Sequence, residues 1–99
     1  MLKWRLVMER DVEQYFVNEA KKQGALALKF ISPGNSGVPD RLVIRSDGGV
    51  EFVELKSSTG KLRPLQTKVI KLLEYYGQTV TVISSKKEVD RYWRLRREC

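Results

Sequence analysis

Two carboxylates and a lysine stand where they could act together on a phosphate. Glu54 and Lys56 lie at the end of the apolar segment 50–55, and because side chains alternate along a strand they share one face. Asp40 opens the preceding apolar segment, 41–45, directly after Pro39. Asp and Glu oxygens are the ligands that a hard cation such as Mg²⁺ prefers, and a lysine can orient or deprotonate a nearby water. This combination suits hydrolysis of a phosphodiester.

The turn between the two segments decides whether the three side chains can meet. Residues 46–49, Ser-Asp-Gly-Gly, indicate a hairpin. A two-residue turn would set Asp40 opposite Leu55, on the wrong face. A three-residue loop, which the glycines of this segment allow, or a bulge would set Asp40 opposite Glu54 or Lys56. Without that register, Glu54 and Lys56 would be an ordinary surface ion pair, which contributes little stability.

The composition excludes several other chemistries. The chain has 99 residues, enough for a single domain, 1–99, with one core. It has no histidine, which excludes Ser-His-Asp triads and His-ligated zinc sites. The single cysteine, Cys99, excludes a disulfide scaffold and favours a reducing, intracellular location. We expect neither a signal peptide nor a membrane span, since Lys3 and Arg5 interrupt the apolar N-terminus.

The charge balance suggests a polyanionic partner. Lysines and arginines outnumber acidic residues by 19 to 12, giving a formal net charge of +7. A small basic domain is a candidate for nucleic-acid binding, although many small soluble proteins are basic without such a partner.

Hydrophobic periodicity predicts the elements that must carry these residues. We expect helices over about 7–23, 64–76 and from 86 onward, and strands over 25–31, 41–45, 50–55 and 79–83. Residues 32–37 are dense in turn formers and predict a loop. The order α-β-β-β-α-β-α predicts an α/β domain with a mixed sheet: the hairpin is antiparallel and the last strand is reached through a helical crossover.

Three segments in this order resemble a known family. Residues 37–41 (GVPDR), 52–56 (FVELK) and 60–66 (GKLRPLQ) are similar to the motif series of the VRR-NUC domain. This domain is the virus-type replication and repair branch of the PD-(D/E)xK nucleases. The resemblance extends from the first helix to the strand at 79–83, and it implies a restriction-endonuclease-like fold and a metal-dependent nuclease.

The resemblance also implies a role for each motif residue. Asp40 and Glu54 would be metal ligands, helped by the backbone carbonyl of Leu55. Lys56 would be the catalytic lysine. Gln66, at the start of the helix that follows, would orient a water or contact the scissile region; the alternative is a plain residue of the helix surface.

A glutamate of the first helix completes the metal shell in the family. Glu9 fits that position best, and Glu13, one turn further along, shares its face. For either residue the alternative is a solvated helix edge.

Four residues in or beside the motif segments are candidate contacts to nucleic acid. They are Ser36, in the turn-rich loop, Arg41, Lys61 and Arg63. Arg63 stands where the family often has a Ser-type cap, so it removes a helix cap and adds a positive charge.

The sequence therefore predicts a DNA endonuclease dependent on Mg²⁺ or Mn²⁺ that leaves a 5′-phosphate and a 3′-hydroxyl, as the resemblance implies. We expect structure-selective cleavage of branched DNA, of flap or Holliday-junction type, in replication, recombination or repair, and a phage or mobile-element origin. The alternative is a non-catalytic nucleic-acid-binding module on a nuclease fold. We also expect a homodimer, because apolar residues gather near both ends of the chain: Leu2, Trp4, Leu6, Val7, Tyr92, Trp93 and Leu95. The alternative is that both ends fold back on the chain's own core.

Overall fold

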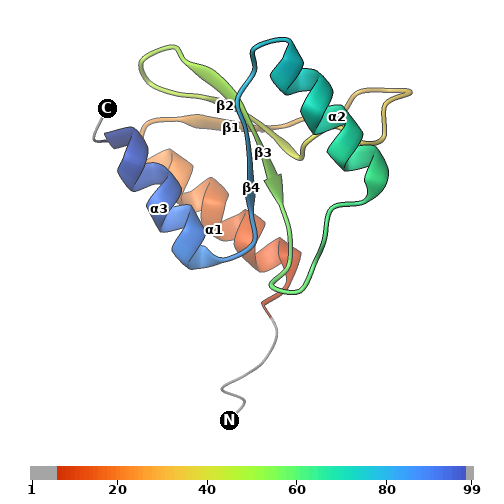
Figure 1. The fold of residues 1–99 in the computed structure, drawn as a ribbon. Helices are drawn as coiled ribbons and strands as arrows, with labels where there is room; N and C mark the ends of the chain where they lie inside the picture. Colours follow the sequence, from red (N-terminus) through yellow and green to blue (C-terminus); the bar gives the residue numbers. More distant parts are fainter. Residues whose placement is uncertain (1–6, 98–99) are drawn as a thin grey trace.

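The structure, a computed structural model, describes residues 7–97. It confirms the predicted order α-β-β-β-α-β-α (Figure 1). The helices and strands are α1 (Glu9–Lys22), β1 (Leu26–Lys29), β2 (Arg41–Ile44), β3 (Val50–Leu55), α2 (Pro64–Tyr75), β4 (Val80–Ile83) and α3 (Lys86–Arg97).

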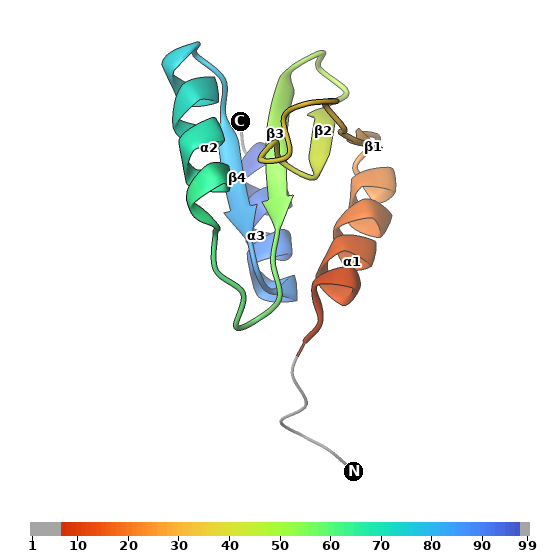
Figure 2. The ribbon, with the colours of Figure 1, turned by 90° about the vertical axis from the view of Figure 1, so that its right-hand side faces the viewer.

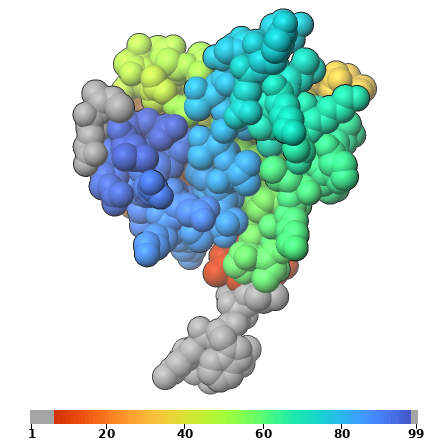
Figure 3. Space-filling view, viewed as in Figure 1, coloured from red at the N-terminus to blue at the C-terminus, as the bar shows by residue number. Residues whose placement is uncertain are grey.

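The strands form one mixed sheet in the order β1-β2-β3-β4. The pairs β1–β2 and β2–β3 are antiparallel, and β3–β4 is parallel. The parallel pair requires a crossover connection, which α2 supplies. β4 is thus an edge strand, and it lies between α3 and α2 in the space-filling view (Figure 3).

The helices lie on both faces of the sheet (Figure 2). α1 and α3 pack together over the face that carries Val43, Val53 and Leu55. α2 packs over the opposite face, mainly against β4. Because side chains alternate along β3, Glu54 points to the α2 side, and the core lies on the α1–α3 side.

That core uses the aromatic residues of α3. Tyr92 is 3% exposed and Trp93 is 2% exposed. The ring of Trp93 stacks on Phe16 of α1 with centroids 5.3 Å apart. The prediction that Tyr92 and Trp93 contribute to a dimer surface is therefore wrong, because α3 folds back onto the chain's own core. Val7 packs partly against this core, and Leu2, Trp4 and Leu6 lie outside the described residues.

The β2–β3 hairpin has the three-residue loop on which the site depends. Arg45 N–H donates to the carbonyl of Gly49 over 2.8 Å, which leaves residues 46–48 as the loop. Gly48 has φ +89°, the left-handed conformation that such a loop requires and that glycine adopts without strain. The register pairs Arg41 with Val53, and continuing it by one residue places Asp40 opposite Glu54.

Candidate active site

Asp40 is fixed at the start of β2 by the neighbouring strand. Its Oδ2 accepts a hydrogen bond of 2.9 Å from the backbone N–H of Leu55. Its own carbonyl accepts one of 2.9 Å from Phe30 N–H. Pro39, which is fully buried, precedes it. The Asp40 side chain is therefore held at the carboxyl end of β3, where the three-residue hairpin loop would place it.

Glu54 and Lys56 meet there in a buried cluster rather than in an exposed surface ion pair. Glu54 is only 2% exposed. Its Oε2 lies 3.2 Å from Lys56 Nζ and accepts a hydrogen bond of 2.7 Å from Gln66 Nε2. Lys56 Nζ in turn donates to Gln66 Oε1 over 2.9 Å. The three side chains form a closed triangle of polar contacts.

Gln66 also completes the start of α2. Arg63 precedes the helix and its side chain supplies no capping hydrogen bond. The backbone N–H of Arg63 donates instead to Gln66 Oε1, over 2.8 Å. This is half of a capping box, in which the side chain of the third helical residue accepts a hydrogen bond from the backbone of the residue that precedes the helix. The side chain of Gln66 is thus buried and fixed, which excludes the interpretation as a plain surface residue.

Acidic groups accumulate at this end of the sheet. Burial, and then the nearby charge of Asp40, raise the pKa of Glu54 to about 7, against the lowering effects of Lys56 and of the Asp40 backbone. Burial and then Asp40 also raise the pKa of Glu9. A carboxylate whose charge raises the pKa values of two neighbouring glutamates in this way marks a site that a cation would stabilise.

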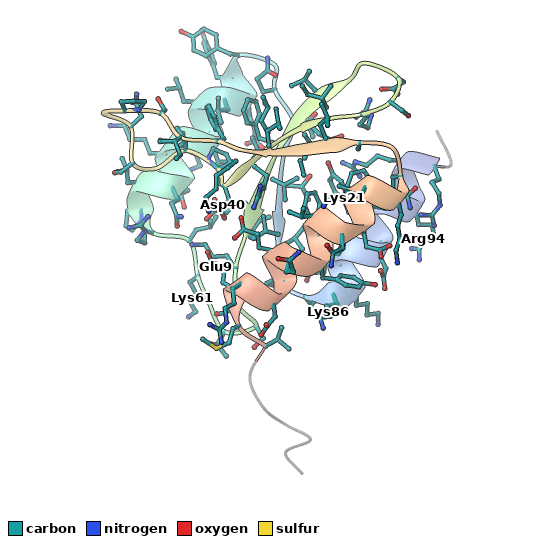
Figure 4. The ribbon with its side chains drawn as sticks, turned by 180° about the vertical axis from the view of Figure 1, so that it is seen from behind. Glu9, Lys21, Asp40, Lys61, Lys86 and Arg94 are labelled. Atoms are coloured by element: carbon teal, nitrogen blue, oxygen red, sulfur yellow. The ribbon has the colours of Figure 1, made fainter. Side chains whose placement is uncertain are left out.

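The two glutamates of α1 have different surroundings. Glu13 is paired with Arg41, whose Nε and Nη2 both lie 2.9 Å from Glu13 Oε2. Glu9, at the beginning of α1, senses the charges of Asp40, Lys56 and Arg63. Figure 4 shows Glu9 near Asp40, with Lys61 on the same side of the molecule. The geometry therefore favours Glu9 as the additional carboxylate of the site.

The four candidate DNA contacts also differ in their surroundings. The guanidinium of Arg41 is held by Glu13 and also donates to the carbonyl of Ala27 over 3.0 Å. Its position thus braces α1 against the sheet. Ser36, Lys61 and Arg63 are exposed. Contact between any of the four and DNA stays a prediction.

Two features of the molecule had no interpretation from the sequence. The Glu13–Arg41 pair joins residues 28 apart in the chain, and no local pattern indicates it. Glu51 is buried on the α1–α3 face with Arg45 and Arg96. The sequence did contain a signal for Glu51. Because side chains alternate along β3, Glu51 shares a face with Val53 and Leu55, and an apolar residue would be expected on that core face.

The donor set fits a small hard cation. Within residues 7–97 no group of three acidic or other metal-binding side chains is close enough to form an all-protein metal cage. Asp40 and Glu54 supply two carboxylates, which matches the way Mg²⁺ is usually held, by one or two carboxylates and several waters.

No helix in the described part of the chain is long and apolar enough to cross a membrane.

A mixed α/β sheet with a carboxylate–lysine–glutamine cluster at the end of β3 defines the restriction-endonuclease-like class. The VRR-NUC domain matches residues 1–87. A protein of Acyrthosiphon pisum secondary endosymbiont phage 1, named "Putative nuclease p44", is 42% identical over 82 residues, which cover 83% of this chain and 88% of that protein. A solved structure, "VRR_NUC domain", matches with a TM-score of 0.80 at 33% identity, and the match covers 87% of this chain and 94% of the chain in that structure. The chain belongs to the VRR-NUC family.

Proposed function

We propose that this chain is a DNA endonuclease that uses a divalent cation, Mg²⁺ or Mn²⁺, to hydrolyse phosphodiester bonds. The observation that carries the proposal is the cluster at the end of β3, where Glu54, Lys56 and Gln66 contact one another within 3.2 Å. Membership of a nuclease family and a net charge of +7 support the same substrate class.

Each residue of the cluster has a distinct task in this proposal. Asp40 and Glu54, with the carbonyl of Leu55, would hold the cation, and Glu9 would approach it from α1. When bound, the cation polarises a phosphate oxygen and makes a nearby water more acidic. Lys56 would hold the attacking water and stabilise the negative charge that develops on the phosphate.

Gln66 would keep the lysine in place, since it holds Lys56 Nζ over 2.9 Å. The water oxygen would form a bond to phosphorus while the bond from phosphorus to the 3′-oxygen breaks. The products would be a 5′-phosphate and a 3′-hydroxyl. The water's proton would pass to solvent, and the 3′-oxygen would gain one on leaving.

Cleavage of a DNA panel tests this function. The purified chain is incubated with linear duplex, single-stranded, flap and four-way-junction DNA, in Mg²⁺, in Mn²⁺ and in EDTA. We expect cleavage only with the cation, and preferentially of the branched DNAs. Binding without cleavage in either cation would instead support the non-catalytic nucleic-acid-binding module. Cleavage that persists in EDTA would contradict the metal-dependent chemistry.

We also propose that two copies act together, through a surface other than the one expected from the sequence. Two cross-strand rows of apolar residues lie on the α2 side of the sheet, and α2 covers mainly β4. We call this the open sheet face; its residues are Leu26, Leu28, Leu42, Ile44, Val50 and Phe52. Leu26, Leu28 and Val50 are about half exposed. A second copy seated on this face would remove its apolar surface from water and offer two active sites to a branched DNA.

The biological setting is proposed as replication, recombination or repair of DNA in a phage-infected cell. A phage protein with 42% identity supports this setting.

A further inference from the structure

One glycine near the site has a role that its backbone conformation does not explain. Gly37 is buried, and a Cβ built on it would lie 2.7 Å from the carbonyl oxygen of Leu65. The same Cβ would lie 2.9 Å from both Leu65 Cγ and Val69 Cγ2. Side-chain carbons essentially never approach other heavy atoms this closely, and the nearest one is a backbone atom that cannot rotate away. Space, rather than a left-handed φ, requires glycine here.

A second glycine of the same loop, Gly34, is required for a different reason. Gly34 has φ +82° and nothing within 4 Å of its hypothetical Cβ. Its requirement is conformational, and a side chain there would point into open space. Within the loop between β1 and β2, therefore, Gly34 shapes the turn and Gly37 sets how closely the loop approaches α2.

The contact of Gly37 lies between the two halves of the site. On one side, Leu65 immediately precedes Gln66, whose hydrogen bonds to Glu54 and Lys56 are 2.7 and 2.9 Å long. On the other side, buried Pro39 leads from Gly37 to Asp40. Hydrogen bonds weaken steeply when a displacement of one partner bends the angle at the donated hydrogen below about 120°.

We propose that Gly37 is a positioning residue of the active site: its bare Cα lets the loop before Asp40 close onto the first turn of α2, at the depth where Gln66 reaches both Glu54 and Lys56. The geometric part stands on the contacts alone, and the catalytic part rests on the proposed nuclease function. A methyl group at this position pushes α2 outward and lengthens the Gln66 contacts.

The geometric part is tested without any activity. In ¹⁵N-labelled protein the side-chain amide signal of Gln66 is identified by its loss in Gln66→Ala. We expect Gly37→Ala to move this signal toward the position of a solvent-exposed glutamine amide, and Gly34→Ala to leave it in place. An unmoved Gln66 signal in folded Gly37→Ala overturns the proposal. Should Gly37→Ala fail to fold, Val69→Ile adds a smaller bulk at the same contact. The Gln66 amide signal of that variant must then move in the same direction.

The catalytic part is tested by a double-mutant cycle on DNA cleavage. We expect Gly37→Ala to lower kcat by on the order of 10²-fold with little change in KM. In the Gln66→Ala background, the same substitution should cost far less, because the contact through which it acts is already absent. Equal losses in both backgrounds overturn the positioning role. Absence of cleavage by the unchanged chain contradicts the nuclease proposal and leaves the amide-signal test standing.

Discussion

Gln66 holds Lys56 through a hydrogen bond of 2.9 Å between its side-chain carbonyl oxygen and the lysine Nζ. The amide nitrogen of the same side chain donates to Glu54. The orientation of the lysine is thus fixed by groups that are themselves buried, before any substrate binds. Fixed donors of this kind cost no reorganisation during reaction, which is the main source of electrostatic catalysis.

Asp40→Asn and Glu54→Gln should each abolish Mg²⁺-dependent cleavage while the protein stays folded. Each substitution removes one negative charge with little change of volume, and the cation would lose one of the carboxylates that hold it. Cleavage rates and circular dichroism spectra of the two variants check this. Glu74→Gln, on the exposed surface of α2, is the matched control. Near wild-type cleavage by either site variant would show that the ligands are misassigned.

Lys56→Ala should reduce the cleavage rate by on the order of 10²-fold or more while DNA binding is retained. The reason is that the lysine contributes mainly in the transition state, when negative charge develops on the phosphate. Rates at saturating DNA, together with Kd values measured in Ca²⁺, separate the two effects. If affinity and rate fall in proportion, Lys56 is a phosphate anchor instead.

DNA affinity should fall steeply with salt, because each phosphate contact by the basic surface releases condensed counterions. We expect a loss of at least about tenfold between about 50 and about 200 mM salt. Fluorescence anisotropy of a labelled junction in EDTA, where no cleavage occurs, measures it. An affinity that stays flat across this range would argue against recognition dominated by the DNA backbone.

Glu51→Gln should destabilise the fold at neutral pH by about 3 kcal/mol, since it breaks a buried ion pair with Arg96 and Arg45. Burial raises the pKa of Glu51, but hydrogen bonds from Arg96 and Arg45 outweigh it, so the pKa is lowered overall. The stabilisation by Glu51 is therefore complete above the pKa of the unfolded glutamate, about 4.3, and is lost as the pH falls through the lower folded value.

Urea unfolding of Glu51→Gln and of the unchanged chain at pH 7, 5 and 3 measures this dependence. The difference in free energy of unfolding should be full at pH 7 and should shrink at pH 3. Glu74→Gln, on the exposed surface of α2, is the control and should change stability by less than about 0.5 kcal/mol. A difference that is constant with pH would mean that the charge of Glu51 is not what stabilises the fold.

Leu28→Glu should convert a dimer into a monomer, because it places a charge on a half-exposed position of the open sheet face. Light scattering at micromolar concentration measures the mass. Asn18→Glu, on the exposed side of α1, makes the same change in charge and should leave the mass unchanged. A mass of one chain for the unchanged protein would contradict the dimer and require each active site to act alone.

The sequence predicted the elements, because strong periodicity and turn chemistry mark them locally. The motif residues were predicted from the resemblance of three short segments to the VRR-NUC domain. It left the register of the hairpin open, since both loop lengths fit residues 46–49. Gly48 in the left-handed conformation resolves it by placing Asp40 opposite Glu54.

Long-range packing lay beyond the sequence. An amphipathic α3 presents Tyr92 and Trp93 equally well to its own core or to a partner, and only the tertiary fold shows that they are buried. The pairing of Glu13 with Arg41 likewise depends on how α1 lies on the sheet. Because this pair occupies Glu13, Glu9 is the glutamate of α1 that is left to face the site.

The capping bond from Arg63 N–H to Gln66 makes this glutamine a poor marker of an active enzyme. In a chain that no longer cleaves DNA this bond would still stabilise the start of α2 by about 1 kcal/mol, so selection for stability alone would favour the glutamine. Lys56 makes no such contribution to a helix end. Under the proposed nuclease function, loss of the lysine would therefore mark the loss of DNA cleavage, whereas loss of the glutamine would weaken the start of α2 without unfolding the chain.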